Sequence, residues 1–146
     1  MNIYLDMCSI QRPLDTKTHP RIAVEAEAIL GVLTLCEGGQ VKLMTSDTLV
    51  FELERNPHPV RKTYALDVLA KATVSIQIDN QIKERARIFQ AEGIKPIDAL
   101  HLASAVAAKA DYFCTCDDRF LKRAKAVDTG QTKVVSPLEL IAEVTQ

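Results

Sequence analysis

The sequence predicts an α/β fold, a three-layer sandwich in which helices cover both faces of a mostly parallel central sheet. Two observations support this prediction. Short apolar segments alternate along the whole chain with longer segments of helical periodicity, as in parallel strands joined by crossover helices. The chain has 146 residues, of which 47% are hydrophobic, and this is enough for one substantial core. We therefore expect a single domain over residues 1–146.

The first half of the chain contains two predicted strands and three predicted helices. The apolar segment NIYL, residues 2–5, precedes Asp6 and is the first strand, and residues 41–46 are the second. Helices are predicted over 21–39, 47–57 and 61–72, and the first of these ends at Gly38-Gly39. Its expected buried face comprises Ile22, Ala26, Ile29, Leu30, Leu33 and Cys36. Residues 11–20, QRPLDTKTHP, are expected to form a loop.

The second half continues the alternation. Strands are predicted over 74–78, 112–116 and 132–136. Helices are predicted over 80–93, ending at Gly93, over the Ala- and Leu-rich segment 96–110, and over 118–126. A last helix over 137–144 has Pro137 in its first turn, where proline is favoured.

The charge of the chain limits the substrates it can attract. A formal net charge of −1 gives no global attraction to nucleic acid, so a phosphate-bearing substrate needs a local basic patch, a metal ion, or both. The segments KERAR (83–87) and RFLKRAK (119–125) are two such patches, although solvated helix faces are the simpler interpretation. No apolar run approaches the ~20 residues of a membrane span, and the first ten residues lack the basic region of a signal peptide. We expect a cytoplasmic protein without membrane association.

The cysteines indicate packing rather than chemistry. Cys114 and Cys116 lie two residues apart on a predicted strand and therefore share a face. No matching pair of cysteines or histidines accompanies them, as a zinc site would require. We interpret both thiols as small apolar side chains in the core.

Carboxylates at one edge of the sheet are the better candidates for chemistry. In an open parallel sheet, ligands bind beyond the carboxyl ends of the strands. Asp6 and Asp117 each follow a predicted strand, Glu52 lies in the helix after residues 41–46, and Asp98 lies in the first turn of a helix that leads back to the sheet. Three other acids have simpler roles: Asp111 precedes its strand and belongs at the opposite edge, while Asp79 and Asp47 are expected to begin helices.

A group of carboxylates in one cleft needs a counter-charge. Without a cation the carboxylates repel one another, and some take up protons. Because all of these ligands are oxygen atoms, they favour Mg²⁺ or Mn²⁺ over zinc or copper. The sequence thus indicates a divalent-metal site at the carboxyl edge of the sheet.

Four segments resemble the four acidic motifs of the PIN domain family, over residues 3 to about 120: YLDMCSI, TSDTLVFELER, IDALHLASAV and TCDDRF. The resemblance implies a metal-dependent ribonuclease with a parallel sheet, similar to the VapC-like toxins of toxin–antitoxin pairs. Its four acids correspond to Asp6, Glu52, Asp98 and Asp117, which would bind Mg²⁺ or Mn²⁺. Glu54 and Asp118 are neighbouring alternatives, and the spacing from Ser46 favours Glu52. A protein antitoxin and a homodimer are the partners it implies, with RNA as the substrate.

The sequence departs from the family pattern at one position. Met7 follows the first acid, where the family usually has Thr or Ser, and Ser9 is a candidate substitute for the missing hydroxyl. Thr115 resembles the family's supporting polar residue near the fourth acid. Arg12 and Arg119 are candidate phosphate contacts, with surface charge as the alternative. His101, one helical turn after Asp98, either faces the cleft or is an ordinary packed or solvated histidine.

Two other classes of function compete with the nuclease. One is a catalytically silent PIN-type module that binds RNA or protein, which the unusual Met7 keeps open. The other is a phospho-accepting signalling domain, which would need paired acids after the first strand, where Asp6 stands alone. Metal-dependent cleavage would mark the nuclease, and formation of an acyl phosphate would mark the signalling domain.

Overall fold

All 146 residues are described in the computed structural model, which contains five strands and eight α-helices. The first half comprises β1 (Asn2–Leu5), α1 (Met7–Gln11), the 3₁₀ helix η1 (Arg12–Leu14), α2 (Pro20–Glu37), β2 (Lys42–Ser46), α3 (Asp47–Glu54) and α4 (Pro59–Leu69). The second half comprises β3 (Val74–Ile76), α5 (Asn80–Ala91), α6 (Pro96–Ala107), β4 (Tyr112–Cys114), α7 (Asp118–Lys125), β5 (Lys133–Val135) and α8 (Pro137–Val144). The predicted α/β class is confirmed.

The five strands form one parallel sheet with the order β3-β2-β1-β4-β5. β1 is the central strand, and in the register Ile3 lies opposite Leu43 of β2 and Tyr112 of β4. The chain first adds strands on one side of β1 and then crosses to the other side. The strand order therefore reverses between β1 and β4, and such a switch point is where open parallel sheets bind ligands.

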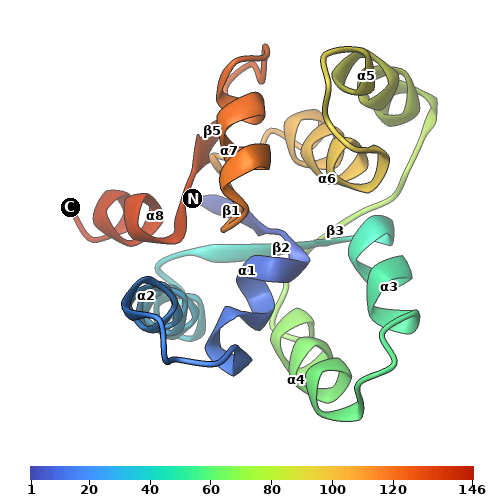
Figure 1. The fold of residues 1–146 in the computed structure, drawn as a ribbon. Coiled ribbons are helices and arrows are strands. Elements are labelled where there is room, and N and C mark those ends of the chain that lie inside the picture. Colours follow the sequence, from blue (N-terminus) through green and yellow to red (C-terminus); the bar gives the residue numbers. More distant parts are fainter.

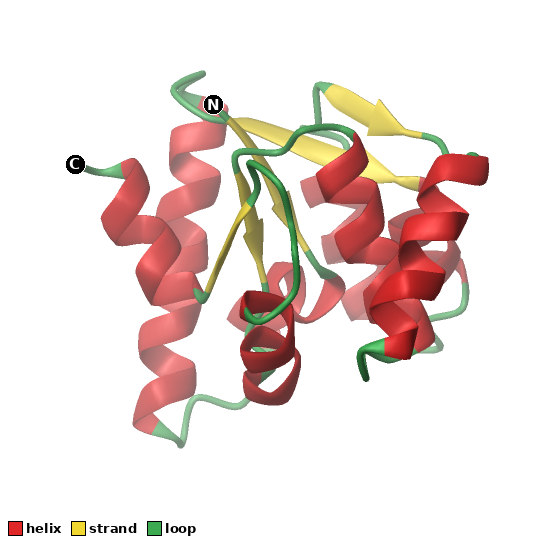
Figure 2. Cartoon of the chain, turned by 90° about the horizontal axis from the view of Figure 1, so that it is seen from above, coloured by secondary structure: helices red, strands yellow, loops and turns green.

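Helices cover the sheet on both faces. α2 packs against α8 on one face, and α5 packs against α6 on the other (Figure 1). Seen from above, these two groups of helices lie on opposite sides of the strands (Figure 2). The three layers bury β1 on both faces, since Ile3, Tyr4 and Leu5 are fully inaccessible to solvent. None of the helices is both long and apolar enough to be a candidate for spanning a membrane.

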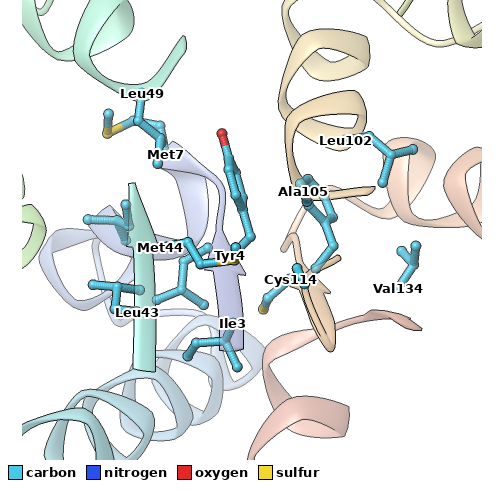
Figure 3. Packing of buried hydrophobic residues seen from close by; sticks show 14 of the residues in the cluster. Ile3, Tyr4, Met7, Leu43, Met44, Leu49, Leu102, Ala105, Cys114 and Val134 are labelled. Atoms are coloured by element: carbon cyan, nitrogen blue, oxygen red, sulfur yellow. The ribbon is translucent and has the colours of Figure 1, made fainter. Parts of the chain in front are cut away.

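The core is built around β1. Thirty-two buried residues form one hydrophobic cluster, and Tyr4 of β1 lies between Leu49 of α3 and Leu102 of α6 (Figure 3). The Tyr4 ring stacks on Phe113 of β4 with centroids 5.3 Å apart. Its hydroxyl oxygen points away from Ile3 and contacts two polar side chains, Ser46 and His101. This residue therefore connects the apolar core to the polar end of the sheet.

The structure corrects three details of the sequence prediction. The predicted loop at 11–20 is partly helical, because α1 and η1 run without interruption through Leu14. The predicted face of α2 is rotated, since Leu30 is 41% exposed while Glu25 is buried. Glu25 turns inward because Arg12 lies 3.1 Å from its carboxylate and compensates its charge. Finally, β3 and β4 end two residues earlier than predicted, so that Cys116 lies outside the strand although it is buried.

Candidate active site

Asp6 is held rigidly where β1 ends. It is the N-cap of α1, and its Oδ1 accepts hydrogen bonds from the Ser9 backbone N–H at 3.1 Å and from the Cys8 thiol at 3.1 Å. Its own N–H donates to the Cys114 carbonyl of β4 at 3.1 Å. The residue is only 4% exposed. Asp6 is therefore fixed at the switch point between β1 and β4, with Oδ1 occupied by protein donors.

Asp117 has the equivalent position after β4. It is the N-cap of α7, and its Oδ1 accepts from the N–H groups of Arg119 at 3.0 Å and Phe120 at 3.1 Å. Its own N–H donates to Thr115 Oγ1 at 3.2 Å. That hydroxyl also lies 3.6 Å from the Cys8 thiol. The side chains of Thr115 and Cys8 thus join the segments that carry the first and fourth acids.

The four predicted acids come together in one open pocket of about 120 Å³. Glu52 reaches it from the middle of α3 and Asp98 from the first turn of α6. The complete lining consists of Asp6, Met7, Cys8, Glu52, Asp98, His101 and Asp117. Acids from four separate segments of the chain therefore share one cavity at the carboxyl edge of the sheet.

The acids repel one another. Burial first, and then the neighbouring carboxylates of Asp6, Asp117 and Glu52, raise the pKa of half-buried Asp98 to about 6. Burial likewise raises the pKa of Asp6, although the hydrogen bonds from the Cys8 thiol and the Ser9 N–H oppose this effect. A cation in the pocket would remove this unfavourable interaction.

A family model described as PIN domain matches residues 3–126, which is most of the chain. The chain belongs to the PIN domain family. The predicted resemblance is thereby confirmed. No curated protein matches the sequence.

Solved structures share the fold of this PIN domain at low sequence identity. FitAcB from Neisseria gonorrhoeae aligns with a TM-score of 0.55 and 16% identity over 93% of this chain and 98% of the other. VapBC2 from Rickettsia felis, bound to a DNA fragment from its promoter, aligns with a TM-score of 0.60 and 13% identity over the same shares. FitAB bound to an IR36 DNA fragment aligns with a TM-score of 0.55 and 17% identity over 92% and 94%. These likenesses show the fold.

A buried chain of hydrogen bonds reaches the second acid of the PIN domain. The Tyr4 hydroxyl lies 2.6 Å from Ser46 Oγ and 2.6 Å from His101 Nδ1. The other ring nitrogen of His101, Nε2, contacts Glu52 Oε1. His101 is thus both packed, at 1% exposure, and part of the pocket wall. Sequence reasoning identified His101 as a candidate from its place one turn after Asp98, but nothing in the sequence indicated Tyr4.

The hydroxyl that Met7 lacks is not replaced by Ser9. The Ser9 side chain donates to the Cys114 carbonyl at 3.3 Å, and only its backbone N–H reaches Asp6. The Cys8 thiol instead donates to Asp6, a role that sequence reasoning missed. Its position two residues after an N-capping acid was the available signal. Met7 contributes an apolar wall to the pocket.

Five other acids of the PIN domain lie outside the pocket, and for Asp111, Asp79 and Asp47 this agrees with the prediction. Asp111 accepts from the Asn2 N–H at 2.6 Å, at the amino edge of the sheet. Asp79 caps α5 through the Ile82 N–H at 2.9 Å, and Asp47 is the first residue of α3. Asp118 is paired with Arg21 on the surface, and Glu54 lies in a separate groove between α3 and α4.

The two candidate phosphate contacts differ in their surroundings. Arg12 forms ion pairs with Asp15 at 2.9 Å and Glu25 at 3.1 Å, so its charge is compensated within the chain. Arg119 has no ion-pair partner and lines a second pocket that also contains Asp98 and Asp117. Of the two arginines, Arg119 is therefore the one that is free to meet an anionic ligand beside the acids.

Cys114 and Cys116 are buried and pack as small apolar groups. Cys114 belongs to the hydrophobic cluster, and burial raises the pKa of its thiol well above the usual value. The neighbouring Cys116 thiol and burial also raise the pKa of Cys8. The protein contains no disulfide, and no group of three or more His, Cys, Asp and Glu side chains is close enough to enclose a metal ion.

Proposed function

We propose that this PIN domain is a ribonuclease that hydrolyses RNA phosphodiester bonds with Mg²⁺ or Mn²⁺, as in VapC-like toxins. PIN domains are generally nucleases. The observation that supports the activity in this chain is the pocket shared by Asp6, Glu52, Asp98 and Asp117. Four acids from distant segments in one cavity create repulsion that a structural role would not require.

The donor set fits a hard divalent cation. Every carboxylate of the pocket supplies oxygen atoms, which suit Mg²⁺ and Mn²⁺. Asp6, Asp98 and Asp117, with Glu52, would hold the ion. Because no three of these side chains enclose one point, water molecules would complete the coordination, as Mg²⁺ commonly requires. When bound, the ion supplies Lewis-acid activation of water and neutralises charge on the phosphate.

The residues of the chain have distinct tasks in this proposal. Asp6 is oriented by the Ser9 N–H and the Cys8 thiol, which leaves Oδ2 for the pocket. Glu52 is oriented by His101, a positioning residue. Thr115 supports the turn that presents Asp117, and Ser9 supports the turn that presents Asp6. Arg119 is the favoured phosphate contact, whereas Arg12 in that role would first have to leave its ion pairs.

A protein antitoxin and a homodimer are the proposed partners. The fold is shared with VapBC2 and FitAB, whose solved structures are complexes with DNA. Exposed apolar side chains on α3 and α4, namely Val50, Phe51, Val60 and Leu66, offer surface for association. This surface is separate from the acidic pocket, so association and cleavage can be tested independently.

The test combines cleavage with metal binding. Purified protein should cleave RNA with Mg²⁺ or Mn²⁺ and stop in EDTA. Asp6→Asn, Glu52→Gln, Asp98→Asn and Asp117→Asn should each reduce cleavage strongly and shrink the rise in melting temperature on adding Mn²⁺. Asp79→Asn and Asp111→Asn are matched controls that remove one charge outside the pocket and should behave as wild type. Cleavage that persists in EDTA would refute the proposal, and RNA binding without any cleavage would favour the silent binding module.

A further inference from the structure

A second pocket adjoins the acidic one and has the opposite charge on its rim. It lies between α7 and the segment that joins α5 to α6, and Asp98 and Asp117 belong to both cavities. Its cations are Lys95, Arg119 and Arg123. A polyanion that entered the acidic pocket would therefore meet three positive charges immediately beside it.

These cations are available for a ligand. Arg119, Arg123 and Lys95 make no ion pair, whereas most other arginines of the chain are paired with carboxylates. Arg123 donates a hydrogen bond to the Gly93 carbonyl, and this neutral acceptor does not compensate the positive charge of the guanidinium. Gly93 has φ +97°, and a Cβ atom there would lie 2.8 Å from Arg123 Nη1. A glycine at this turn thus allows the guanidinium to lie against the backbone at the rim of the groove.

The positive charge continues along α7. Residues 119, 122 and 123 share one helical face by their spacing, while Phe120 and Ala124 are buried on the other. Arg119, Lys122 and Arg123 line a further shallow depression that extends to Ala126. From residue 119 to 123 the helix rises about 6 Å, so the charges form a track that leads away from the acids.

We propose that this track, Lys95, Arg119, Lys122 and Arg123, binds the phosphates of the RNA strand that flank the scissile phosphate. The inference rests on the proposed function and adds to it the path and the mode of substrate binding. Phosphate matches the track because arginine binds its oxygens bidentately. The track also offsets the repulsion between the RNA backbone and the four carboxylates, which a chain of net charge −1 does not otherwise counter.

The chemistry of the track predicts binding through the backbone rather than through the bases. The chain has no tryptophan, and Phe120, the aromatic residue of α7, is 4% exposed and faces the core. No aromatic platform therefore stacks a base along the track, and phosphate contacts alone carry no sequence information. Sequence preference, where the enzyme has one, must then arise at the acidic pocket or from the shape of the RNA.

The test measures RNA binding by a protein that cannot cleave. Binding of a labelled single-stranded RNA 20-mer is measured by fluorescence anisotropy in an Asp6→Asn background with Mg²⁺. Arg119→Gln with Lys122→Gln should weaken this binding about tenfold or more. The magnitude of the slope of log K against log salt should fall by about 1.4, as expected for two lost phosphate contacts to a single strand. This pair keeps the contact between Arg123 and Gly93, so the groove remains intact. The matched control is Lys42→Gln with Lys109→Gln, which removes two exposed, unpaired charges from the opposite edge of the sheet and should change binding and slope little.

The outcomes separate this inference from the proposed function. In otherwise wild-type protein, Arg119→Gln with Lys122→Gln should raise KM for a long RNA. If cleavage is present but binding, slope and KM are unchanged, the track is wrong and the nuclease remains. An equal loss in the Lys42→Gln with Lys109→Gln control means that only net charge matters, which also overturns the track. If the wild-type protein does not cleave RNA and the Asp6→Asn protein does not bind RNA, both proposals fail.

Discussion

The Tyr4 hydroxyl lies 2.6 Å from Nδ1 of His101, at a point where both residues are inaccessible to solvent. The other ring nitrogen of His101, Nε2, contacts the Glu52 carboxylate, which lines the pocket. Ser46, the N-cap of α3, is the remaining partner of Tyr4 and accepts the Leu49 N–H at 3.2 Å. The strand β1, the cap of α3 and the helix α6 are thereby connected to one acid of the site.

One assignment of protons satisfies the whole chain of hydrogen bonds. Burial raises the pKa of Tyr4 well above its usual value, so that the phenol keeps its proton. Ser46 then donates to Tyr4, Tyr4 donates to His101 Nδ1, and Nε2–H donates to Glu52. In this arrangement Nε2–H of His101 donates to the Glu52 carboxylate and orients it.

Tyr4→Phe should disturb the site without changing its charge. It removes the partner of two buried polar groups, and we expect a loss of about 1–3 kcal/mol in the free energy of unfolding. Cleavage should fall mainly through kcat, because Glu52 would be less well held while RNA contacts remain. Denaturant unfolding and steady-state kinetics measure the two effects.

Tyr112→Phe is the matched control for this prediction. Tyr112 donates to Glu143 at 3.2 Å at the other end of the sheet, so its change should alter neither kcat nor KM. His101→Gln retains a donor near the Nε2 position and should keep more activity than His101→Ala. If Tyr4→Phe lowered stability but left kcat intact, Tyr4 would not position Glu52 through His101.

The acids could be predicted from the sequence, whereas this chain of hydrogen bonds could not. Asp6 directly follows β1 and Asp117 lies three residues after the end of β4, so a local pattern and the rule for parallel sheets suffice to place them. Tyr4 and His101 are 97 residues apart, and only the packing of α6 over β1 joins them. The buried face of α2 also differs from the prediction because of a contact between two different segments of the chain. Leu30 is exposed and Glu25 buried because Arg12, from a segment predicted to be a loop, supplies the compensating charge.

Asp98→Asn should stabilise the metal-free protein at neutral pH. The pKa of Asp98 is raised to about 6 in the folded state, above the ~3.9 of an unfolded aspartate. Between these two pKa values the folded state binds more protons than the unfolded state. The free energy of unfolding therefore falls as pH rises through this window. The amide avoids this loss, and the melting temperature in EDTA should be higher than wild type at pH 7.5 but similar at pH 4.

With Mn²⁺ at pH 7.5, wild type should melt at a higher temperature than Asp98→Asn, because the ion then neutralises the wild-type carboxylate. Asp79→Asn is the control, since asparagine caps a helix as well as aspartate does. If wild type melted at a higher temperature than Asp98→Asn in EDTA at pH 7.5, the proposed repulsion between the acids would be contradicted.

Cys114→Ala should affect packing alone. The thiol is fully buried in the cluster around β1, and its removal should cost about 1–2 kcal/mol in the free energy of unfolding. Cys116→Ala should cost less, because that residue lies beyond the strand. Neither change should alter the rise in melting temperature on adding Mn²⁺. A folded double variant that no longer responds to the metal would show that the thiols, and not the carboxylates alone, hold the ion.

Leu66→Glu should prevent the proposed homodimer. Leu66 is 50% exposed on α4 and lines an apolar groove with Val50 of α3 and Leu69. A charge placed in an apolar interface is costly to desolvate, so a dimer that uses this groove should dissociate. Light scattering at micromolar concentration should give a dimer mass for wild type and a monomer mass for the variant. Ile88→Glu is the matched control, because Ile88 is 53% exposed on α5, away from this groove, and its change should leave the dimer mass unaltered. A monomer mass for wild type would refute the dimer, and a dimer mass for Leu66→Glu would place its interface elsewhere on the chain.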